Sequence, residues 1–235
     1  MPNWVEQEAK RNNRNLLMIS VVILVIGAVL LFLIYDEATR RFAHDEAKKQ
    51  GDLNAMYVVG ALLLWPLWNL LRSLRRMGAL HSTPVWKQLA QYGDVEQIAA
   101  HIAQEEQMDS SKYKLLTITR SWIIRRGPFK TSVWPMGDLL WAYQQTTRVY
   151  TYAIIRIGKY HSVVLANRRG QKMEVRMTKA QAEALIPQLA ERVPWAFFGY
   201  SIELWNALRK DLAGFVAALD VRRQQYFAKS KAATS

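Results

Sequence analysis

The 235-residue chain contains no cysteine and only four histidines, so the side chains that most often act as nucleophiles, zinc ligands and catalytic bases are scarce. Neither a Gly-x-Ser-x-Gly element nor a Gly-x-x-x-x-Gly-Lys phosphate loop occurs. The histidines are scattered and form no His-x-x-x-His pair: His44, His81, His101 and His161. We therefore expect no catalytic residue, no cofactor and no metal site, and we predict that the protein is not an enzyme. The lack of cysteine agrees with a reducing compartment but suits either side of a membrane.

Charged residues are absent from two long stretches near the N-terminus. The first, Leu16 to Tyr35, has 20 uncharged residues, which as a helix span roughly 30 Å, the thickness of a bilayer's hydrocarbon core. No small-x-small cleavage site follows it, so an uncleaved anchor fits better than a signal peptide. The second, residues 53–71, is weakened by Pro66 and Asn69, and a buried helix of a soluble domain is its alternative. The pattern predicts a transmembrane helical hairpin over residues 1–76, with spans at about 16–35 and 53–71.

The distribution of basic residues predicts an orientation and a neighbouring surface. Six Lys or Arg lie on the outer flanks of the two spans and four lie in the loop between them, which favours cytoplasmic N- and C-termini. The formal net charge is +13, and 22 of the 32 bases but only 12 of the 19 acids follow Arg76, so that part carries +10. A basic domain beside a membrane meets anionic lipid first, at about 1 kcal/mol for each base close to the surface. Nucleic acid is the less favoured partner.

Helical patterns continue between the apolar runs and after them. Residues 36–52 are expected to extend the first span as a helix that stops at Gly51-Asp52. Residues 77–108 predict a connecting helix pair, in which Asp94 caps a helix running from Val95 to about Gln107. The adjacent acids near the end of that helix, Glu105 and Glu106, are interpreted as a solvated pair.

Residues 109–192 show the short apolar alternation of β-strands followed by one helix. Seven strand segments are predicted: LLTIT, SWIIRR, TSVWP, DLLWAYQQTT, YAIIRI, YHSVVLAN and QKMEVRM. They indicate a compact sandwich or barrel. Thr178 and Gln181 then predict a capping box that opens an amphipathic helix. In residues 193–235 the pattern predicts a long helix that starts at Ser201. The basic tail beyond Arg222 is expected to fray.

Several motifs in this part resemble those of pleckstrin-homology-like (PH-like) domains in an uncharacterised family of bacterial membrane-anchored proteins. They are the turn Gln91–Asp94, the pair Leu116-Thr117, the strand Trp122 to Arg126, the segment PMGDLLWAY (135–143) and the turn Phe198–Ser201. The resemblance covers about Val85 to Tyr226. It implies an α+β membrane protein of the bacterial inner membrane, with a seven-stranded PH-like domain after the helical hairpin. It implies no activity, and the connection Thr119–Ser121 is too short for an inositol phosphate cradle.

The candidate binding residues are six bases at the ends of two predicted hairpins. The first group brackets the turn at Gly127 and the second brackets the turn at Gly170: Arg125, Arg126 and Lys130, and Arg168, Arg169 and Lys172. Such tips can meet anionic lipid or an acidic protein partner through screened attraction. The alternative is that they only keep hairpin ends soluble.

Two functions are consistent with this pattern. The first is a membrane-anchored cytoplasmic PH-like module that recruits a protein or contacts anionic lipid without catalysis. The second is an accessory subunit of a transport or secretion complex, bound through its transmembrane hairpin. The tryptophans Trp122, Trp134 and Trp141 fit strand cores better than a base-stacking surface, which argues against nucleic acid.

Overall fold

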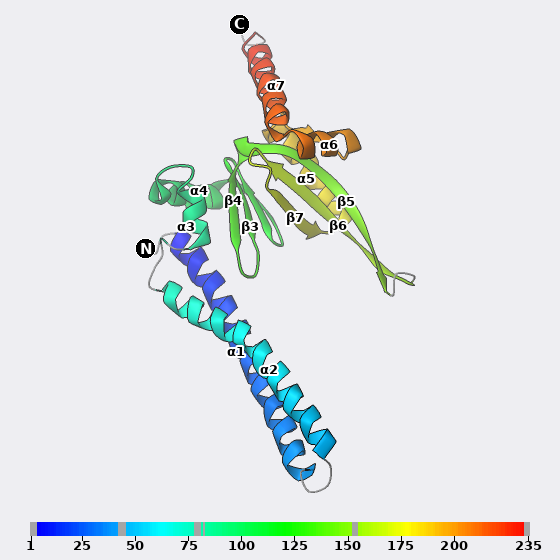
Figure 1. The fold of residues 1–235 in the computed structure, drawn as a ribbon. Coiled ribbons are helices and arrows are strands. Elements are labelled where there is room, and N and C mark those ends of the chain that lie inside the picture. The colour runs from blue at the N-terminus through cyan, green and yellow to red at the C-terminus, as the bar shows by residue number, and fades with distance from the viewer. Residues whose placement is uncertain (1–3, 42–45, 78–80, 82, 152–154, 233–235) are drawn as a thin grey trace. The chain divides into compact units, whose positions relative to one another are not determined.

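The computed structural model describes residues 4–41, 46–77, 81, 83–151 and 155–232 (Figure 1). It consists of two units. The first contains residues 1–100 and 127–131, and the second contains residues 101–126 and 132–235. Helices dominate the first unit and two β-sheets form the second, so the chain is α+β, as the sequence predicts.

Two long helices, α1 (Trp4–Arg41) and α2 (Glu46–Met77), pack against each other in the first unit (Figure 1). Each contains a stretch that is long and apolar enough to cross a membrane, at Trp4–Glu37 and Asn54–Arg72. Most apolar side chains of these stretches are exposed, whereas a core helix of a soluble protein would bury them. The predicted helix stop at Gly51-Asp52 is wrong, because both residues lie inside α2. Helix-forming neighbours on both sides outweigh a single glycine.

The two long helices approach each other closely at one glycine. A Cβ atom added to Gly27 on α1 would collide with the side chain of Leu63 on α2. Small residues permit such close packing between apolar helices. Gly60 on α2 differs, because a Cβ atom there would meet nothing within 4 Å.

Two shorter helices follow, α3 (Pro84–Leu89) and α4 (Val95–Met108). Asp94 caps α4, since its carboxylate accepts hydrogen bonds from the backbone N–H groups of Glu96 at 2.8 Å and Gln97 at 3.3 Å. The predicted helix from Val95 to about Gln107 is confirmed. Within the first unit α3 packs against α1.

Within the described ranges, eight strands form two four-stranded sheets. The first has the order β1 (Ser110–Tyr113), β2 (Leu116–Thr119), β3 (Trp122–Arg126) and β4 (Thr131–Pro135). A single 3₁₀ turn, η2 (Met136–Asp138), leads out of it. The second sheet has the order β7 (Lys172–Met177), β6 (Ile155–Asn167), β5 (Leu139–Thr151) and β8 (Phe197–Phe198). Its pairs are antiparallel except β5 with β8, which is parallel.

The predicted set of seven strands is wrong in two places. The described part of YAIIRI, residues 155–157, and YHSVVLAN belong to one strand, β6, which continues through Gly158 and Lys159; the first three residues of YAIIRI lie outside the described residues. Gly158 pairs with Val149 beside a register shift, and a glycine in a strand often marks such an irregularity rather than a turn. The edge strand β1 was not expected, because its SSKY sequence lacks apolar alternation and is defined only by its hydrogen bonds to β2.

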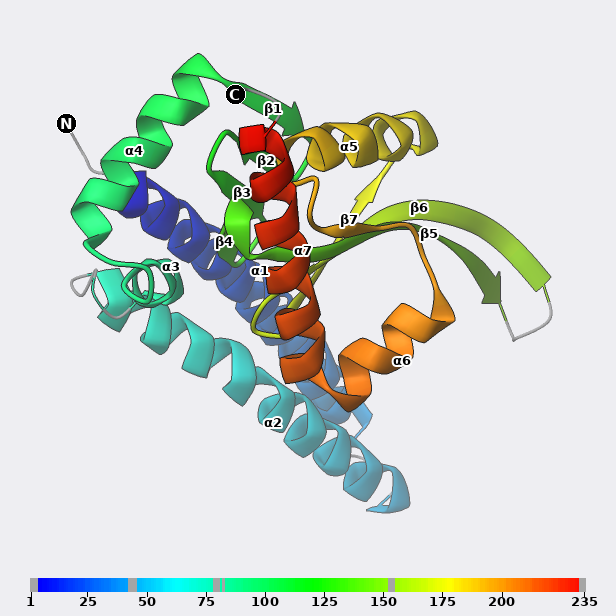
Figure 2. The same ribbon diagram turned by 90° about the horizontal axis from the view of Figure 1, so that it is seen from above.

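Three helices complete the second unit: α5 (Lys179–Arg192), α6 (Ile202–Lys210) and α7 (Leu212–Ala232). The Thr178–Gln181 capping box that opens α5 is confirmed. The predicted single helix from Ser201 is instead two helices that meet at a bend (Figure 2). Asp211 produces the break, because its carboxylate accepts from the N–H of Gly214 at 2.8 Å and starts α7 as a new helix. The tail beyond Arg222 is helical as far as Ala232, so the predicted fraying there is wrong.

One buried apolar cluster holds the second unit together. It contains side chains from both sheets and from α5, α6 and α7. The predicted core positions of the three tryptophans are confirmed, since Trp122, Trp134 and Trp141 are all buried.

A buried carboxylate joins α4 to the first sheet inside the second unit. Glu105 accepts hydrogen bonds from the hydroxyl of Thr119 at 2.6 Å, and from the hydroxyl and backbone N–H of Ser121 at 2.7 and 2.9 Å. Burial alone would raise the pKa of Glu105, but these donors and the neighbouring His101 outweigh it and lower the pKa below its usual range. Glu106 pairs with Arg126. The interpretation of the two acids as a solvated pair is therefore wrong.

The helix contact at Gly27 makes a first prediction. Replacing Gly27 with leucine forces a side chain into the space of Leu63, and overpacking of this kind costs about 1–3 kcal/mol. Thermal unfolding of the full chain in detergent, followed by tryptophan fluorescence, should show a lower Tm. The matched control is Gly60→Leu, which adds the same side chain where no atom is near. Equal effects of the two changes would contradict the proposed close contact.

The Glu105 network makes a second prediction. A lowered folded-state pKa gives stability that is present above the unfolded value of about 4.5 and is lost as the pH falls through the folded value. Glu105→Gln should cost about 1–3 kcal/mol at pH 7. Because the glutamine does not titrate, this variant should also lose less stability than the wild type between pH 5 and pH 3.

Unfolding by urea at several pH values measures both effects. The control is Glu183→Gln, which removes an exposed carboxylate that forms an ion pair with Lys179 on the same helix. An unchanged pH dependence in the Glu105 variant would show that this carboxylate does not contribute to acid sensitivity.

Candidate functional site

Arg125 and Arg126 lie at the end of β3, but their side chains are not both available to a ligand. Arg126 forms an ion pair with Glu106 and donates to the hydroxyl of Thr117 at 2.7 Å. Arg125 is half-buried, and its Nε atom is buried without a hydrogen-bond acceptor among the described residues. The charge of Arg126 is therefore balanced by Glu106 within the protein and is not available to a ligand.

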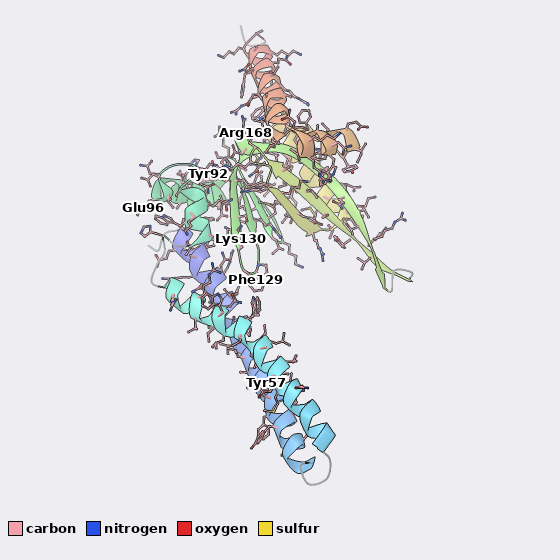
Figure 3. The ribbon with its side chains drawn as sticks, viewed as in Figure 1. Tyr57, Tyr92, Glu96, Phe129, Lys130 and Arg168 are labelled. Carbon is pink, nitrogen blue, oxygen red and sulfur yellow. The ribbon has the colours of Figure 1, made fainter. Side chains whose placement is uncertain are left out.

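Lys130 belongs to the first unit, at the tip of the β3–β4 hairpin beside Phe129 (Figure 3). Both side chains are exposed. The carbonyl of Lys130 accepts from the N–H of Gly127 at 3.0 Å, but the lysine side chain makes no hydrogen bond or ion pair to any part of the chain that the structure describes. Of the first predicted group, it is the base most accessible to solvent.

The second predicted group is engaged by the C-terminal helices. Arg168, at the end of β6 (Figure 3), donates two hydrogen bonds to Asp220 of α7, at 2.7 and 2.5 Å. These bonds raise the pKa of Arg168 and lower the pKa of Asp220. The Nζ atom of Lys172 lies 3.3 Å from the centre of the Trp205 ring. Arg169 is exposed on the turn, where its backbone N–H donates to Asn167 at 3.1 Å.

A cluster of aromatic side chains lies beside Lys172, and the sequence did not predict it as a site. Trp141 of β5 is at its centre. Its ring centre lies 4.4 Å from that of Tyr143, 6.2 Å from that of Tyr200 and 6.4 Å from that of Trp205. Its indole N–H donates to the carbonyl of Gly199 at 2.7 Å. The cluster gathers residues from β5, from the turn after β8 and from α6.

Three rings of this cluster, those of Tyr143, Tyr200 and Trp205, line a groove of about 370 Å³. The lining residues come from β5 and from the segment that leads into α6: Tyr143, Gln144, Gln145, Thr146, Tyr200 and Trp205. Tyr143 is buried and its pKa is raised by that burial, whereas Tyr200 is exposed. The groove combines apolar ring surface with amide and hydroxyl groups, a combination typical of binding sites.

One edge of β5 is open along this groove. The strand β8 pairs with β5 only at Trp141 and Ala142, because the chain turns away at Gly199, whose φ of 86° suits glycine. The carbonyl of Ala142 accepts from the N–H of Gly199 at 3.1 Å, so the backbone groups of Ala142 face the β8 side.

Alternation along the strand then fixes which later groups face outward. The backbone N–H and C=O groups of Gln144, Thr146 and Arg148 point to the same side as those of Ala142. Among the described residues no strand pairs with them on that side. An open edge of this kind can accept an additional strand.

The surroundings of the open edge are basic. Arg148 on β5 and Lys159 on β6 are direct cross-strand partners, and both are exposed. Like charges directly opposite each other are destabilising, so an acidic ligand here would relieve repulsion. Burial, and secondarily the nearby charge of Arg209, lowers the pKa of Lys172, while the acid Glu174 lies close enough to Tyr143 to help raise the pKa of that tyrosine.

The residues that the structure describes contain no group of three or more His, Asp or Glu side chains placed to hold a metal ion. His161 on β6 is close to the groove, and its Nδ1 atom lies 3.0 Å from the hydroxyl of Thr146. This contact joins β5 to β6 beside the groove.

The chain matches the model of a protein family. A model described as "Domain of unknown function (DUF6709)" matches residues 86–208, just over half of the chain. The protein belongs to this family, and the expectation of an uncharacterised family is confirmed. The match begins in α3 and ends in α6, so it includes the groove but not the two long helices. No curated protein and no solved structure matches the chain.

Proposed function

We propose that this protein is a non-catalytic, membrane-anchored interaction module that recruits a protein partner through the open edge of β5. The observation that carries the proposal is the row of outward backbone groups at Gln144, Thr146 and Arg148 beside the aromatic groove. Main-chain hydrogen bonds from an added strand supply affinity in such sites, and neighbouring pockets supply specificity.

The arrangement of the second unit supports a PH-like domain. Two sheets, antiparallel apart from the β5–β8 pair, share one core, and α5 contacts both β5 and β6 after the strand β7. The strand β8 follows that helix in the chain. It pairs with β5 only at Trp141 and Ala142, so the rest of that edge of β5 has no partner strand among the described residues. Fold alone assigns no ligand, so the argument for binding rests on the edge and the groove.

We propose an extended, acidic segment of a partner protein as the occupant. An extended backbone matches the spacing of the outward groups on β5, and acidic side chains complement Arg148, Lys159 and Lys172. An aromatic or apolar side chain of the segment would rest on the rings of Tyr200 and Trp205. A helical segment lacks free main-chain groups and would not use the edge.

The proposed location is the bacterial inner membrane, with α1 and α2 as spans and both termini cytoplasmic. The two long, exposed apolar helices support membrane attachment. The orientation is supported by the six bases on the outer flanks against four in the loop. In this arrangement the groove faces cytoplasmic partners.

A photo-crosslinking experiment tests the β5 edge. A photoreactive amino acid at Gln144, within the full chain in its native host, should crosslink to one partner, and mass spectrometry should place the crosslink in an acidic, extended segment. Adding Thr146→Pro removes one outward N–H donor and should reduce the crosslink about tenfold, because strand addition needs that hydrogen bond.

The matched control is Thr146→Val, which keeps the outward N–H and changes only the side chain. A crosslink that persists in both variants would contradict strand addition at this edge. Crosslinks found only from positions within α2 would favour the second function, an accessory subunit bound through the helical hairpin.

A labelling experiment tests the orientation. The chain has no cysteine, so a single cysteine can be introduced at an exposed site such as Glu183 on α5. With cytoplasmic termini, a membrane-impermeant maleimide should label this cysteine only after the membrane is permeabilised. Labelling of intact spheroplasts would reverse the proposed orientation.

A further inference from the structure

The tip of the β3–β4 hairpin is bound to the N-terminal part of α1 within the first unit. The hydroxyl of Thr131 donates to the buried carboxylate of Glu8 at 2.8 Å, and it accepts from Asn12 at 3.0 Å and Arg11 at 3.2 Å. One turn further along α1, the amide of Asn15 donates to the carbonyl of Pro128 at 3.0 Å. These bonds hold the tip against the helix just before its apolar run.

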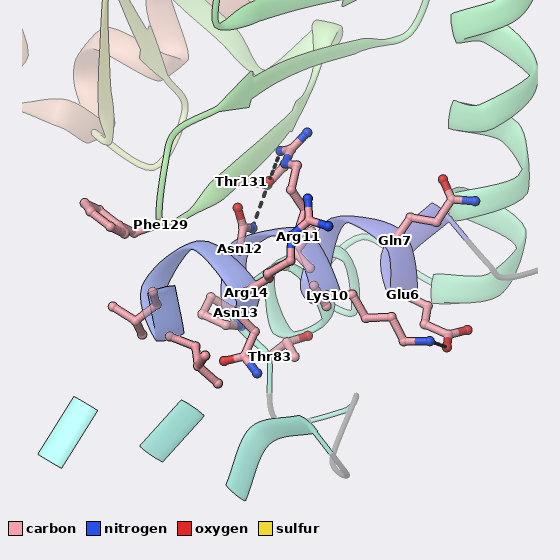
Figure 4. A pocket seen from close by; sticks show the side chains of 15 residues that line it. Glu6, Gln7, Lys10, Arg11, Asn12, Asn13, Arg14, Thr83, Phe129 and Thr131 are labelled. Atoms are coloured by element: carbon pink, nitrogen blue, oxygen red, sulfur yellow. Dashed lines mark hydrogen bonds and ion pairs between the residues drawn. The ribbon is translucent and has the colours of Figure 1, made fainter. Parts of the chain in front are cut away.

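A pocket of about 800 Å³ lies beside this junction (Figure 4). Its volume is within the range of about 300–1,000 Å³ that is common for small-molecule sites. Most of its surface is apolar, and the apolar lining includes Ala9, Leu16, Leu17, Val85 and Phe129. Three helix residues add positive charge to the wall: Lys10, Arg11 and Arg14.

Two of these charges are already balanced. Lys10 pairs with Glu6 at 2.5 Å, and Arg11 pairs with Glu8. The side chain of Arg14 is exposed and makes no hydrogen bond or ion pair to any residue that the structure describes. The pocket therefore carries one uncompensated positive charge, which calls for an anionic ligand.

The pocket also reaches the apolar segment of α1. Leu16 and Leu17 line it and are the first residues of the uncharged run. Arg14 precedes Leu16 by two residues, or about 3 Å of helix rise. If α1 crosses the membrane as proposed, this position places Arg14 at head-group depth and the leucines at the start of the hydrocarbon.

We infer that this pocket binds one anionic phospholipid. Its phosphate pairs with Arg14, and an acyl chain lies against Leu16, Leu17 and Phe129. The charge of the wall, its apolar lining and its continuity with the span match a molecule that has an anionic head and apolar chains. The inference rests on the proposed membrane attachment, and it is independent of the proposed peptide site at β5.

Native mass spectrometry of the full chain tests the inference. The protein is released from nanodiscs that contain phosphatidylglycerol and phosphatidylcholine, and it is washed at high salt to remove lipid held only by screened attraction. We expect one retained phosphatidylglycerol per chain. Arg14→Ala should lower the retained fraction about tenfold, which corresponds to one lost charge-assisted hydrogen bond, while Arg14→Lys should keep most of it.

The control is Arg72→Ala, which removes an exposed arginine at the end of the Asn54–Arg72 stretch that does not line the pocket. Phe129→Ala should also weaken retention, because it removes apolar contact without changing charge. Excess inorganic phosphate should not displace the lipid. The lipid site would be refuted if the Arg14 and Arg72 variants lost the same amount of phosphatidylglycerol, or if the wild type retained as much phosphatidylcholine as phosphatidylglycerol.

Extraction of membranes at alkaline pH separates this inference from the membrane proposal. A chain that stays in the membrane but retains no lipid would refute only the pocket. A chain that is released would refute membrane attachment and the pocket together.

Discussion

The burial of Trp141 is the interaction on which the second unit most depends. The side chain is fully buried, yet its indole N–H must have an acceptor, and the carbonyl of Gly199 supplies it at 2.7 Å. This bond holds the segment after α5 against β5, where Phe197 and Phe198 add a short parallel strand. The same constraint ends that strand, because Gly199 turns the chain away. The open edge of β5 beyond Ala142 therefore follows from the hydrogen bond between the indole N–H of Trp141 and the carbonyl of Gly199.

Several arginine side chains in this protein form ion pairs or hydrogen bonds that connect one helix or strand to another. Arg126 joins β3 to α4 through Glu106, and Arg168 joins the end of β6 to α7 through Asp220. Arg192, at the end of α5, donates to the carbonyl of Thr119 at 2.5 Å and so ties the helix to the first sheet. Isolated exposed ion pairs contribute little, but part-buried pairs with several hydrogen bonds hold elements in register. A large positive net charge therefore overstates the charge that is available for a ligand.

Each of the two units contains one of the two proposed binding sites. The first unit contains the apolar helices and a pocket whose single uncompensated charge, on Arg14, lies next to the beginning of the apolar run. The second unit contains a sheet edge and an aromatic groove with basic surroundings. One site matches lipid chemistry and the other matches polypeptide chemistry. The proposed membrane attachment and the open strand edge together are consistent with the proposed role in recruiting a partner.

Local patterns in the sequence were sufficient for most individual elements. The uncharged runs, the Asp94 and Thr178 caps and the strand-like alternation identify helices and strands through interactions among near neighbours, so they can be read without a structure. Errors arose where a local signal was overruled. Gly158 was read as a turn but lies in β6, and the helix from Ser201 is divided by the cap at Asp211.

The candidate sites depend on contacts between residues that are far apart in the chain. Arg126 and Arg168 look like free hairpin bases in the sequence, because the acids that engage them lie 20 and 52 positions away. The groove needs Tyr143 beside Tyr200, and the pocket needs Arg14 near Phe129. The sequence by itself determined the α+β class, the apolar helices and the absence of catalytic motifs, since these follow from composition and short-range periodicity. Only the tertiary structure decided which charges are neutralised and which strand edge is open, because both depend on long-range packing.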